Sequence, residues 1–390
     1  MGLFSSKPDI KKGDMVYAWT NDQDIAKKAE CGGAVTTLLK YALENKLVDG
    51  VIVVKKGQDI YDAVPTLVTD PKGLKDTAGS LHCGTGLLAN VLKKRFNGAK
   101  NMKIGMTVKG CDLMALQELA RRKEVNLDNL LLIGVNCGGT VSPMMARYMI
   151  TTKYGVDPDK VFKEEIDKGQ FIIEYEGGHK GIKIDELEDE GFGRRSNCRR
   201  CLYKVPRQAD LACGNWGVIG EKAGKATFVE VCSDKGADLM SKAVKAKALE
   251  VSAPEPKGIE IRGKTENAML KLGEKWRKRD FSRLGKDPWT TINNETSRCI
   301  KCYSCIENCP VCIPTAETLK KSYAIEPGQI PPNPMFHLRR FAHISDSCVN
   351  CGQCEELCPM EIPLALFSHA IRVEADAAFE PKLGKPAYSN

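Results

Sequence analysis

The fold of the C-terminal part of this chain is decided by the stretch Cys299-Ile300-Lys301-Cys302-Tyr303-Ser304-Cys305-Ile306-Glu307-Asn308-Cys309-Pro310. The same spacing returns in Cys348-Val349-Asn350-Cys351-Gly352-Gln353-Cys354-Glu355-Glu356-Leu357-Cys358-Pro359. In such a run three thiolates of one tight loop bind one four-iron cluster, and the fourth cysteine, before proline, turns to the other cluster. The two runs therefore predict two [4Fe–4S] clusters, with these ligand sets: Cys299, Cys302, Cys305 and Cys358; and Cys348, Cys351, Cys354 and Cys309.

A pair of zinc sites is the structural alternative, but zinc needs neither this repeated spacing nor the two prolines. Cys312 is left over. It is an alternative ligand to Cys309, although we expect a buried free thiol. The interval between the runs contains Pro331-Pro332-Asn333-Pro334 and then 336–343, which indicates an inserted helix. In this respect the module resembles the α-helical ferredoxins of heterodisulfide reductase and succinate dehydrogenase iron–sulfur subunits.

The composition is that of a globular chain of two or three domains, with 390 residues, 42% hydrophobic and 28% charged. No apolar run approaches the ~20 residues of a membrane span, and the N-terminus has no signal-peptide pattern. We therefore expect a reducing, cytoplasmic location in which the 17 cysteines are free to bind metal. The net charge of +8 accompanies no nucleic-acid motif, and it also suits anionic cofactors and thiolate-bound clusters.

Upstream of the two runs, strands and helices alternate. Buried-type strands are predicted at 51–54, 103–108 and 130–135, and helices at 34–45, from Asp112 (as N-cap) to about Lys123, and through Met149. This order predicts an α/β domain in the N-terminal part. A linker at 251–258 and a polar, solvated helix at 265–283 lie within 246–290, and a mostly helical, ferredoxin-type domain follows at 291–375.

Four cysteines of the N-terminal part form a third candidate site. Cys111 and Cys137 each follow a predicted strand, where ligand sites of α/β sheets gather, and Cys198 and Cys201 form a CxxC pair. Spacing alone leaves a [4Fe–4S] cluster and zinc equally open, the latter with Cys198, Cys201, Cys213 and Cys232 as ligands. Six basic residues surround the pair: Arg194, Arg195, Arg199, Arg200, Lys204 and Arg207. They would balance a cluster, guide an anionic substrate, or form a solvated loop.

Three small-residue loops are candidates for a nucleotide cofactor. Cys31-Gly32-Gly33 opens a predicted helix whose free N–H groups favour phosphate. The second loop is 80–86, with Ser80 and Gly84, and the third is 214–220. In the third, Gly214 and Gly217 flank Trp216, whose indole would suit a flavin. Ordinary turns and a core tryptophan explain each loop separately about as well.

Taken in order, these segments resemble a known family. The stretch from Cys31 to Thr36, then 110–112, 133–138, the CxxC pair and 209–214 resemble the β subunit of F420-reducing hydrogenase and F420-dependent formate dehydrogenase, over roughly 14–245. The added ferredoxin module resembles the formate dehydrogenase form. The resemblance implies an α/β domain with FAD that exchanges hydride with coenzyme F420, beside a third [4Fe–4S] cluster on Cys111, Cys137, Cys198 and Cys201. Cys213 departs from the family pattern, so Cys213 and Cys83 are possible substitutes for the fourth ligand.

The resemblance also implies the partner, a formate-oxidising molybdopterin subunit, because nothing in this sequence resembles a molybdopterin site. Two other hypotheses remain: an F420 oxidoreductase subunit linked to hydrogenase or heterodisulfide reductase, and an electron-transfer adaptor without a substrate. Because a flavin passes both hydride and single electrons, no general-base residue is required. The sequence shows no Ser/His/Asp arrangement, and we assign no catalytic side chain.

Overall fold

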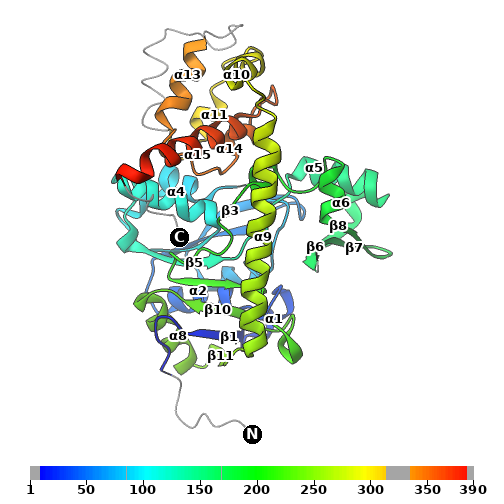
Figure 1. Ribbon diagram of the computed structural model, residues 1–390. Coiled ribbons are helices and arrows are strands. Elements are labelled where there is room, and N and C mark those ends of the chain that lie inside the picture. The colour runs from blue at the N-terminus through cyan, green and yellow to red at the C-terminus, as the bar shows by residue number, and fades with distance from the viewer. Residues whose placement is uncertain (1–8, 85, 168, 313–333, 384–390) are drawn as a thin grey trace.

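The computed structural model describes residues 9–84, 86–167, 169–312 and 334–383. An α/β part and a mostly helical C-terminal part are joined along one side by the long helix α9 (Pro256–Ser282) (Figure 1). At 27 residues, α9 is roughly 40 Å long, since a helix rises about 1.5 Å per residue. The predicted α/β N-terminal region is thereby confirmed.

The α/β part is built on one eight-stranded sheet in the order β11-β1-β10-β9-β5-β4-β2-β3. Strands β2, β4, β5 and β9 are parallel to one another, and two antiparallel pairings through β10 bring β1 into the same direction. The strands are β1 (Met15–Thr20), β2 (Gly50–Lys56), β3 (Ala63–Val68), β4 (Ile104–Val108), β5 (Leu130–Val135), β9 (Leu211–Gly214), β10 (Thr227–Val231) and β11 (Leu249–Ser252).

Helices cover both faces of this sheet. In β5, Leu131 and Ile133 pack into a core with α2 (Ala34–Glu44) and α8 (Asp234–Lys245). Leu130 and Leu132 face the other way, into a core with α3 (Leu88–Phe96) and α4 (Gly110–Arg121). Both faces of β5 are therefore buried, which explains why the strand reads as a continuous apolar run.

The carboxyl ends of five strands lie at one edge of the sheet. These ends are Thr20, Lys56, Val108, Val135 and Gly214. Helix α2 begins beside the first of them, because the Thr20 amide donates to the Gly32 carbonyl at 2.7 Å. The predicted segments of Cys31, Cys111 and Cys137 thus follow strands that end at this edge, as expected for an α/β sheet.

A second, three-stranded sheet lies beside the first part. It consists of β6 (Val161–Asp167), β7 (Gln170–Tyr175) and β8 (Gly178–Lys183), all antiparallel. The surrounding helices are α1 (Gln23–Lys28), α5 (Pro143–Met149), α6 (Ile184–Asp189) and α7 (Ser196–Arg199), of which α5 and α6 lie next to the small sheet (Figure 1).

The segment predicted as a linker and a solvated helix differs in the structure. Leu249–Ser252 forms the edge strand β11, paired with β1, and α9 already begins at Pro256. Nor is α9 solvated all round. It buries Arg262 and Asp280, which form ion pairs with Glu230 at 2.5 Å and with Arg200 at 2.7 Å. The sequence suggested a solvated helix because α9 packs through charged pairs and glycines, which give no apolar period.

One predicted helix start also needs correction. Helix α4 begins at Gly110 with Lys109 as N-cap, so Asp112 is its third residue and not the cap. The Asp112 carboxylate reaches back and accepts from the Lys109 amide at 3.3 Å. Gly110 itself lies close to Tyr203, because a Cβ there would lie 2.3 Å from the Tyr203 carbonyl oxygen.

The C-terminal part is helical, with short loops around the cysteines. Its helices are α10 (Pro288–Thr296), α11 (Ser304–Glu307), α13 (Pro334–His343), α14 (Gln353–Glu356) and α15 (Leu364–Leu383). They gather at one end of α9 (Figure 1). Helix α13 is the predicted inserted helix, and its Phe336 and Phe341 enter a core with Phe367 of α15. The interval 313–333 lies outside the described residues.

Candidate iron–sulfur and flavin sites

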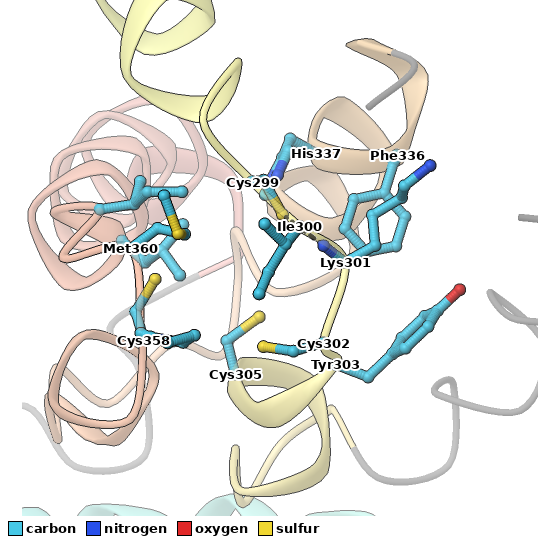
Figure 2. Close-up of a pocket in the computed structure, with 13 residues that line it drawn as sticks. Cys299, Ile300, Lys301, Cys302, Tyr303, Cys305, Phe336, His337, Cys358 and Met360 are labelled. Carbon is cyan, nitrogen blue, oxygen red and sulfur yellow. Dashed lines mark hydrogen bonds between the residues drawn. The ribbon is translucent and has the colours of Figure 1, made fainter. Parts of the chain in front are cut away.

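The first predicted C-terminal set lines one cavity. Figure 2 shows Cys299, Cys302, Cys305 and Cys358 around a common space. Cys358 of the second run, the cysteine before Pro359, therefore lies with the three cysteines of the first run. The loop is tight, with Lys301 and Tyr303 at positive φ, and the Lys301 amide donates to the Cys299 sulfur at 3.3 Å. Burial raises the pKa of the Cys299 thiol to about 11. The side chains suit a cluster, whose iron would hold these thiols as thiolates.

The second predicted set lines the other cavity. Cys309 of the first run, the cysteine before Pro310, lies in this cavity with the second run. The four thiols belong to Cys309, Cys348, Cys351 and Cys354. Burial raises the pKa of Cys348 to about 11. The buried side chain of Arg340 also lines this cavity. Four thiols around one cavity with a neighbouring guanidinium fit an anionic thiolate-bound cluster better than they fit a neutral core.

Cys312 lies beside Cys309 and lines neither cavity. Its thiol donates to Cys309, which lowers the pKa of Cys309 to about 7 and raises that of Cys312. The arrangement favours Cys309 as the thiolate ligand and Cys312 as a buried thiol that donates to it.

The third set comes together from three separate segments. Cys111 stands in the first turn of α4, Cys137 follows β5, and Cys198 and Cys201 belong to α7 and the residue pair after it. Cys198 lies close enough to raise the pKa of both Cys111 and Cys137, and Cys201 also raises the pKa of Cys137. Burial raises the pKa of both Cys111 and Cys137.

Cys198 differs from these two thiols. Burial opposes its ionisation, but Arg195 and hydrogen bonds from Thr140 outweigh burial and lower the pKa of the Cys198 thiol. The Thr140 hydroxyl lies 3.7 Å from the Cys198 sulfur. Likewise the Tyr203 amide donates to the Cys201 sulfur at 3.4 Å. Such donors stabilise a metal-bound thiolate.

The alternative ligands lie elsewhere. Cys213 packs in the core on the α2 side of the sheet, whereas Cys111 and Cys201 pack on the α4 side. Its titratable neighbours include Cys232 and Cys31. Cys83 is buried in a third core and donates to Glu164 at 2.7 Å. The structure therefore separates the zinc set proposed from spacing. In the described part of the chain, no three or more His, Cys, Asp or Glu side chains are grouped to hold a single metal ion.

The basic residues around Cys198 do not form a solvated loop. Arg194, Arg200 and Lys204 are buried, and the Arg194 guanidinium donates to Glu188 at 2.9 Å and to the Gly138 carbonyl at 2.8 Å. Arg195 has 8% of its side chain exposed and pairs with Glu356 of α14 at 3.0 Å. The charges of Cys198, Cys351 and Cys111 all act on Arg195. This residue therefore lies between the third set and the second.

A buried clasp joins the loops of these two sets. The Asn197 side chain donates to the Asn350 carbonyl at 3.1 Å, and the Asn350 side chain donates to the Asn197 carbonyl at 3.0 Å. Contact is close: a Cβ on Gly352 would lie 2.3 Å from the Asn197 amide oxygen. Asn197 and Asn350 are each one residue from a predicted cluster ligand, Cys198 and Cys351. No sequence pattern indicates this clasp, because each asparagine alone is an ordinary loop residue.

The three candidate flavin loops lie at or near the carboxyl edge of the sheet. Gly33, in the left-handed region, is the N-cap of α2, whose first turn has neither a side-chain cap nor an acidic residue. Thr36 lies on the same helix. A Cβ on Gly32 would lie 2.6 Å from the Ala226 backbone, so only glycine fits there. The free N–H groups of this turn suit a phosphate.

The other two loops are tied to the first. His82 approaches Glu30 at 3.4 Å, which brings the loop of Ser80 and Gly84 beside Cys31. On the other side Cys31 lies near Thr227 of β10, a strand paired with β9, at whose end Gly214 stands.

The third loop is anchored through its carbonyls. Gly217 accepts from the Tyr17 hydroxyl at 2.6 Å, and Trp216 accepts from Arg262 at 3.3 Å. Its backbone is therefore held from β1 and from α9.

With this geometry in place, comparison with known proteins identifies the class. Residues 15–93 and 101–257 match the N-terminal and C-terminal families described as "Coenzyme F420 hydrogenase/dehydrogenase, beta subunit", and 295–362 match a "4Fe-4S dicluster domain". The chain belongs to the coenzyme F420 hydrogenase/dehydrogenase β-subunit family and carries a 4Fe–4S dicluster domain. It is an oxidoreductase subunit, as the sequence predicted.

Within this family the chain is 50% identical over 340 residues to F420-dependent formate dehydrogenase 1 subunit beta of Methanococcus maripaludis, covering 86% of each chain. It is 49% identical to F420-dependent formate dehydrogenase subunit beta of Methanocaldococcus jannaschii, over 85% of this chain and 86% of that one. A chain of the F420-reducing [NiFe] hydrogenase complex from Methanosarcina barkeri has the same fold, with a TM-score of 0.59, 21% identity, and coverage of 72% of this chain and 96% of that chain.

None of the helices within 9–84, 86–167, 169–312 and 334–383 combines the length and apolar character needed to cross a bilayer.

Proposed function

We propose that this chain is the β subunit of an F420-dependent formate dehydrogenase. When bound, FAD would exchange hydride with coenzyme F420 and pass single electrons to three [4Fe–4S] clusters. The chain's own residues would hold these groups in series. Cys31, Gly32, Gly33, Thr36, Ser80, Gly84, Gly214, Trp216 and Gly217 are proposed to bind the flavin. Cys111, Cys137, Cys198 and Cys201, the third set, would hold a cluster beside the flavin.

The observation that carries this proposal is the continuity of the three cysteine sets. The Asn197–Asn350 clasp and Arg195 connect the third set to the set of Cys351. Arg340 faces thiols of that second set and also Cys305 of the first set. The first set reaches the surface, because Cys302 is exposed. The order supports a path from the α/β part to a partner that docks near Cys302, and we propose a formate-oxidising molybdopterin subunit as that partner.

The experiment is anoxic purification of the chain with its partner subunit, followed by an absorbance spectrum and an assay of formate-dependent F420 reduction. Bound flavin together with F420 reduction is the expected result. A protein without flavin would be an electron-transfer adaptor. A flavoprotein that reduces F420 with hydrogenase or heterodisulfide reductase as its partner, but not with formate, would move the proposal to that second function.

A further inference from the structure

Arg340, on the inserted helix α13, is a buried cation without a hydrogen-bonded partner. It is 0% exposed, and none of its three side-chain nitrogens has a hydrogen-bond partner among the described residues. Removing a guanidinium from water costs several kcal/mol unless an anion or acceptors replace the water. The fold therefore retains a charge whose counterpart must be something that faces it.

The groups facing Arg340 are the cluster thiols. Its titratable neighbours are Cys305 of one set and Cys309 and Cys354 of the other, together with Cys312. One turn earlier on α13, His337 lines the first cavity. Burial, and then Arg340 itself, lower the pKa of His337 to about 3, so that this imidazole is neutral.

Arg372 and Lys301 are further buried cations near the two C-terminal sets. Arg372 has its own partner in Asp376, at 2.7 Å, and Lys301 lies in the first cysteine loop, lining the first cavity. Arg340 differs from both because thiols of both sets act on it. Its side chain thus lies between the two cavities.

We propose that Arg340 is the shared counter-charge of both C-terminal clusters and raises the reduction potential of each. The inference rests on the proposal that both cysteine sets bind [4Fe–4S] clusters. An added electron makes a cluster more negative, so a fixed cation beside it stabilises the reduced form. Because one guanidinium serves both clusters, it raises both potentials together and keeps electron exchange between them balanced.

The test is a redox titration, followed by electron paramagnetic resonance, of the anoxically purified protein with Arg340→Met, Arg340→Lys and Arg339→Gln. Arg339 is the exposed neighbour on the same helix, so its substitution is the matched control. In Arg340→Met we expect the equilibrium constant for reduction of both C-terminal clusters to fall tenfold or more. For a one-electron couple that corresponds to a decrease of 59 mV or more. Arg340→Lys and Arg339→Gln should stay near the original values, as should the cluster of Cys198.

Each outcome decides the proposal. Unchanged potentials in an Arg340→Met protein with full iron content would overturn it, as would a decrease at one C-terminal cluster alone. If Arg340→Met loses its C-terminal iron while Arg340→Lys keeps both the iron and the potentials, the charge requirement is supported. If both variants lose the iron, the shape of arginine and not its charge is what matters, and the proposal fails. Iron content and spectrum of the unsubstituted chain test the presence of clusters separately, without any F420 assay.

Discussion

The Asn197–Asn350 clasp allows a specific structural test. In it, each asparagine side chain donates to the other residue's carbonyl, and so joins two predicted cluster loops. Asn197→Ala removes the bond donated to the Asn350 carbonyl and leaves that buried carbonyl without its donor. Such a change costs about 1–3 kcal/mol. Taking about 2 kcal/mol, the population in which the two loops separate should rise roughly 30-fold, since 1.4 kcal/mol is a factor of ten.

The assay is native-state hydrogen exchange of the amides in 349–356, with formate-dependent F420 reduction measured in parallel. Exchange in this loop should accelerate by roughly the same factor as the open population, and electron transfer should slow. Asn294→Ala, at an exposed position of α10, is the control and should change neither quantity. Unaltered exchange in 349–356 with Asn197→Ala would refute the clasp as the element that holds the two parts together.

Three further predictions follow from the sites. Anoxically purified protein should contain about twelve iron atoms per chain, from three four-iron clusters, and elemental analysis that found eight irons with one zinc would assign zinc to the N-terminal set. The double variant Arg194→Gln, Arg195→Gln should have a lower reduction potential at the Cys198 cluster. The salt dependence of KM for F420 should stay unchanged, because both arginine side chains are buried and form ion pairs. A flattened salt dependence would instead indicate that these arginines guide the substrate. Burial raises the pKa of Glu164 from 4.5 to about 7, so between these two pH values the folded state binds more protons than the unfolded state. The free energy of unfolding should therefore fall by about 3 kcal/mol as pH rises from 4.5 to 7. Thermal unfolding of Glu164→Gln should lack this decrease, and an equal decrease in the variant would assign it to another group.

The sequence predicted those features that depend on local spacing. Strand β5 and helix α13 follow from an apolar run and from a proline-led helical stretch. The exchange of Cys309 and Cys358 between the two runs was expected from the position of each before proline, and the two cavities are lined accordingly. Cluster binding itself stays a prediction for these residues.

Features made by tertiary contact were beyond sequence reasoning. No sequence pattern singles out Arg340, because only the packing of α13 against the two cysteine loops buries its side chain. The basic residues near Cys198 suggested a solvated or substrate-guiding patch, because their partners Glu188, Asp280 and Glu356 lie in other elements. Helix α9 was predicted as a solvated helix for the same reason, since the charge pairs through which it packs leave no apolar period in the sequence.

The central claim is that the three cysteine sets relay electrons in the order third set, second set, first set. The most direct measurement is rapid-freeze electron paramagnetic resonance of the isolated chain after mixing with reduced F420, in the original protein and in Cys351→Ala. In the original protein the flavin should bleach and all clusters should be reduced. In Cys351→Ala the flavin and the Cys198 cluster should still be reduced, while the cluster of Cys299 stays oxidised because its neighbour is missing. Reduction of that last cluster at the original rate in the variant would contradict the relay.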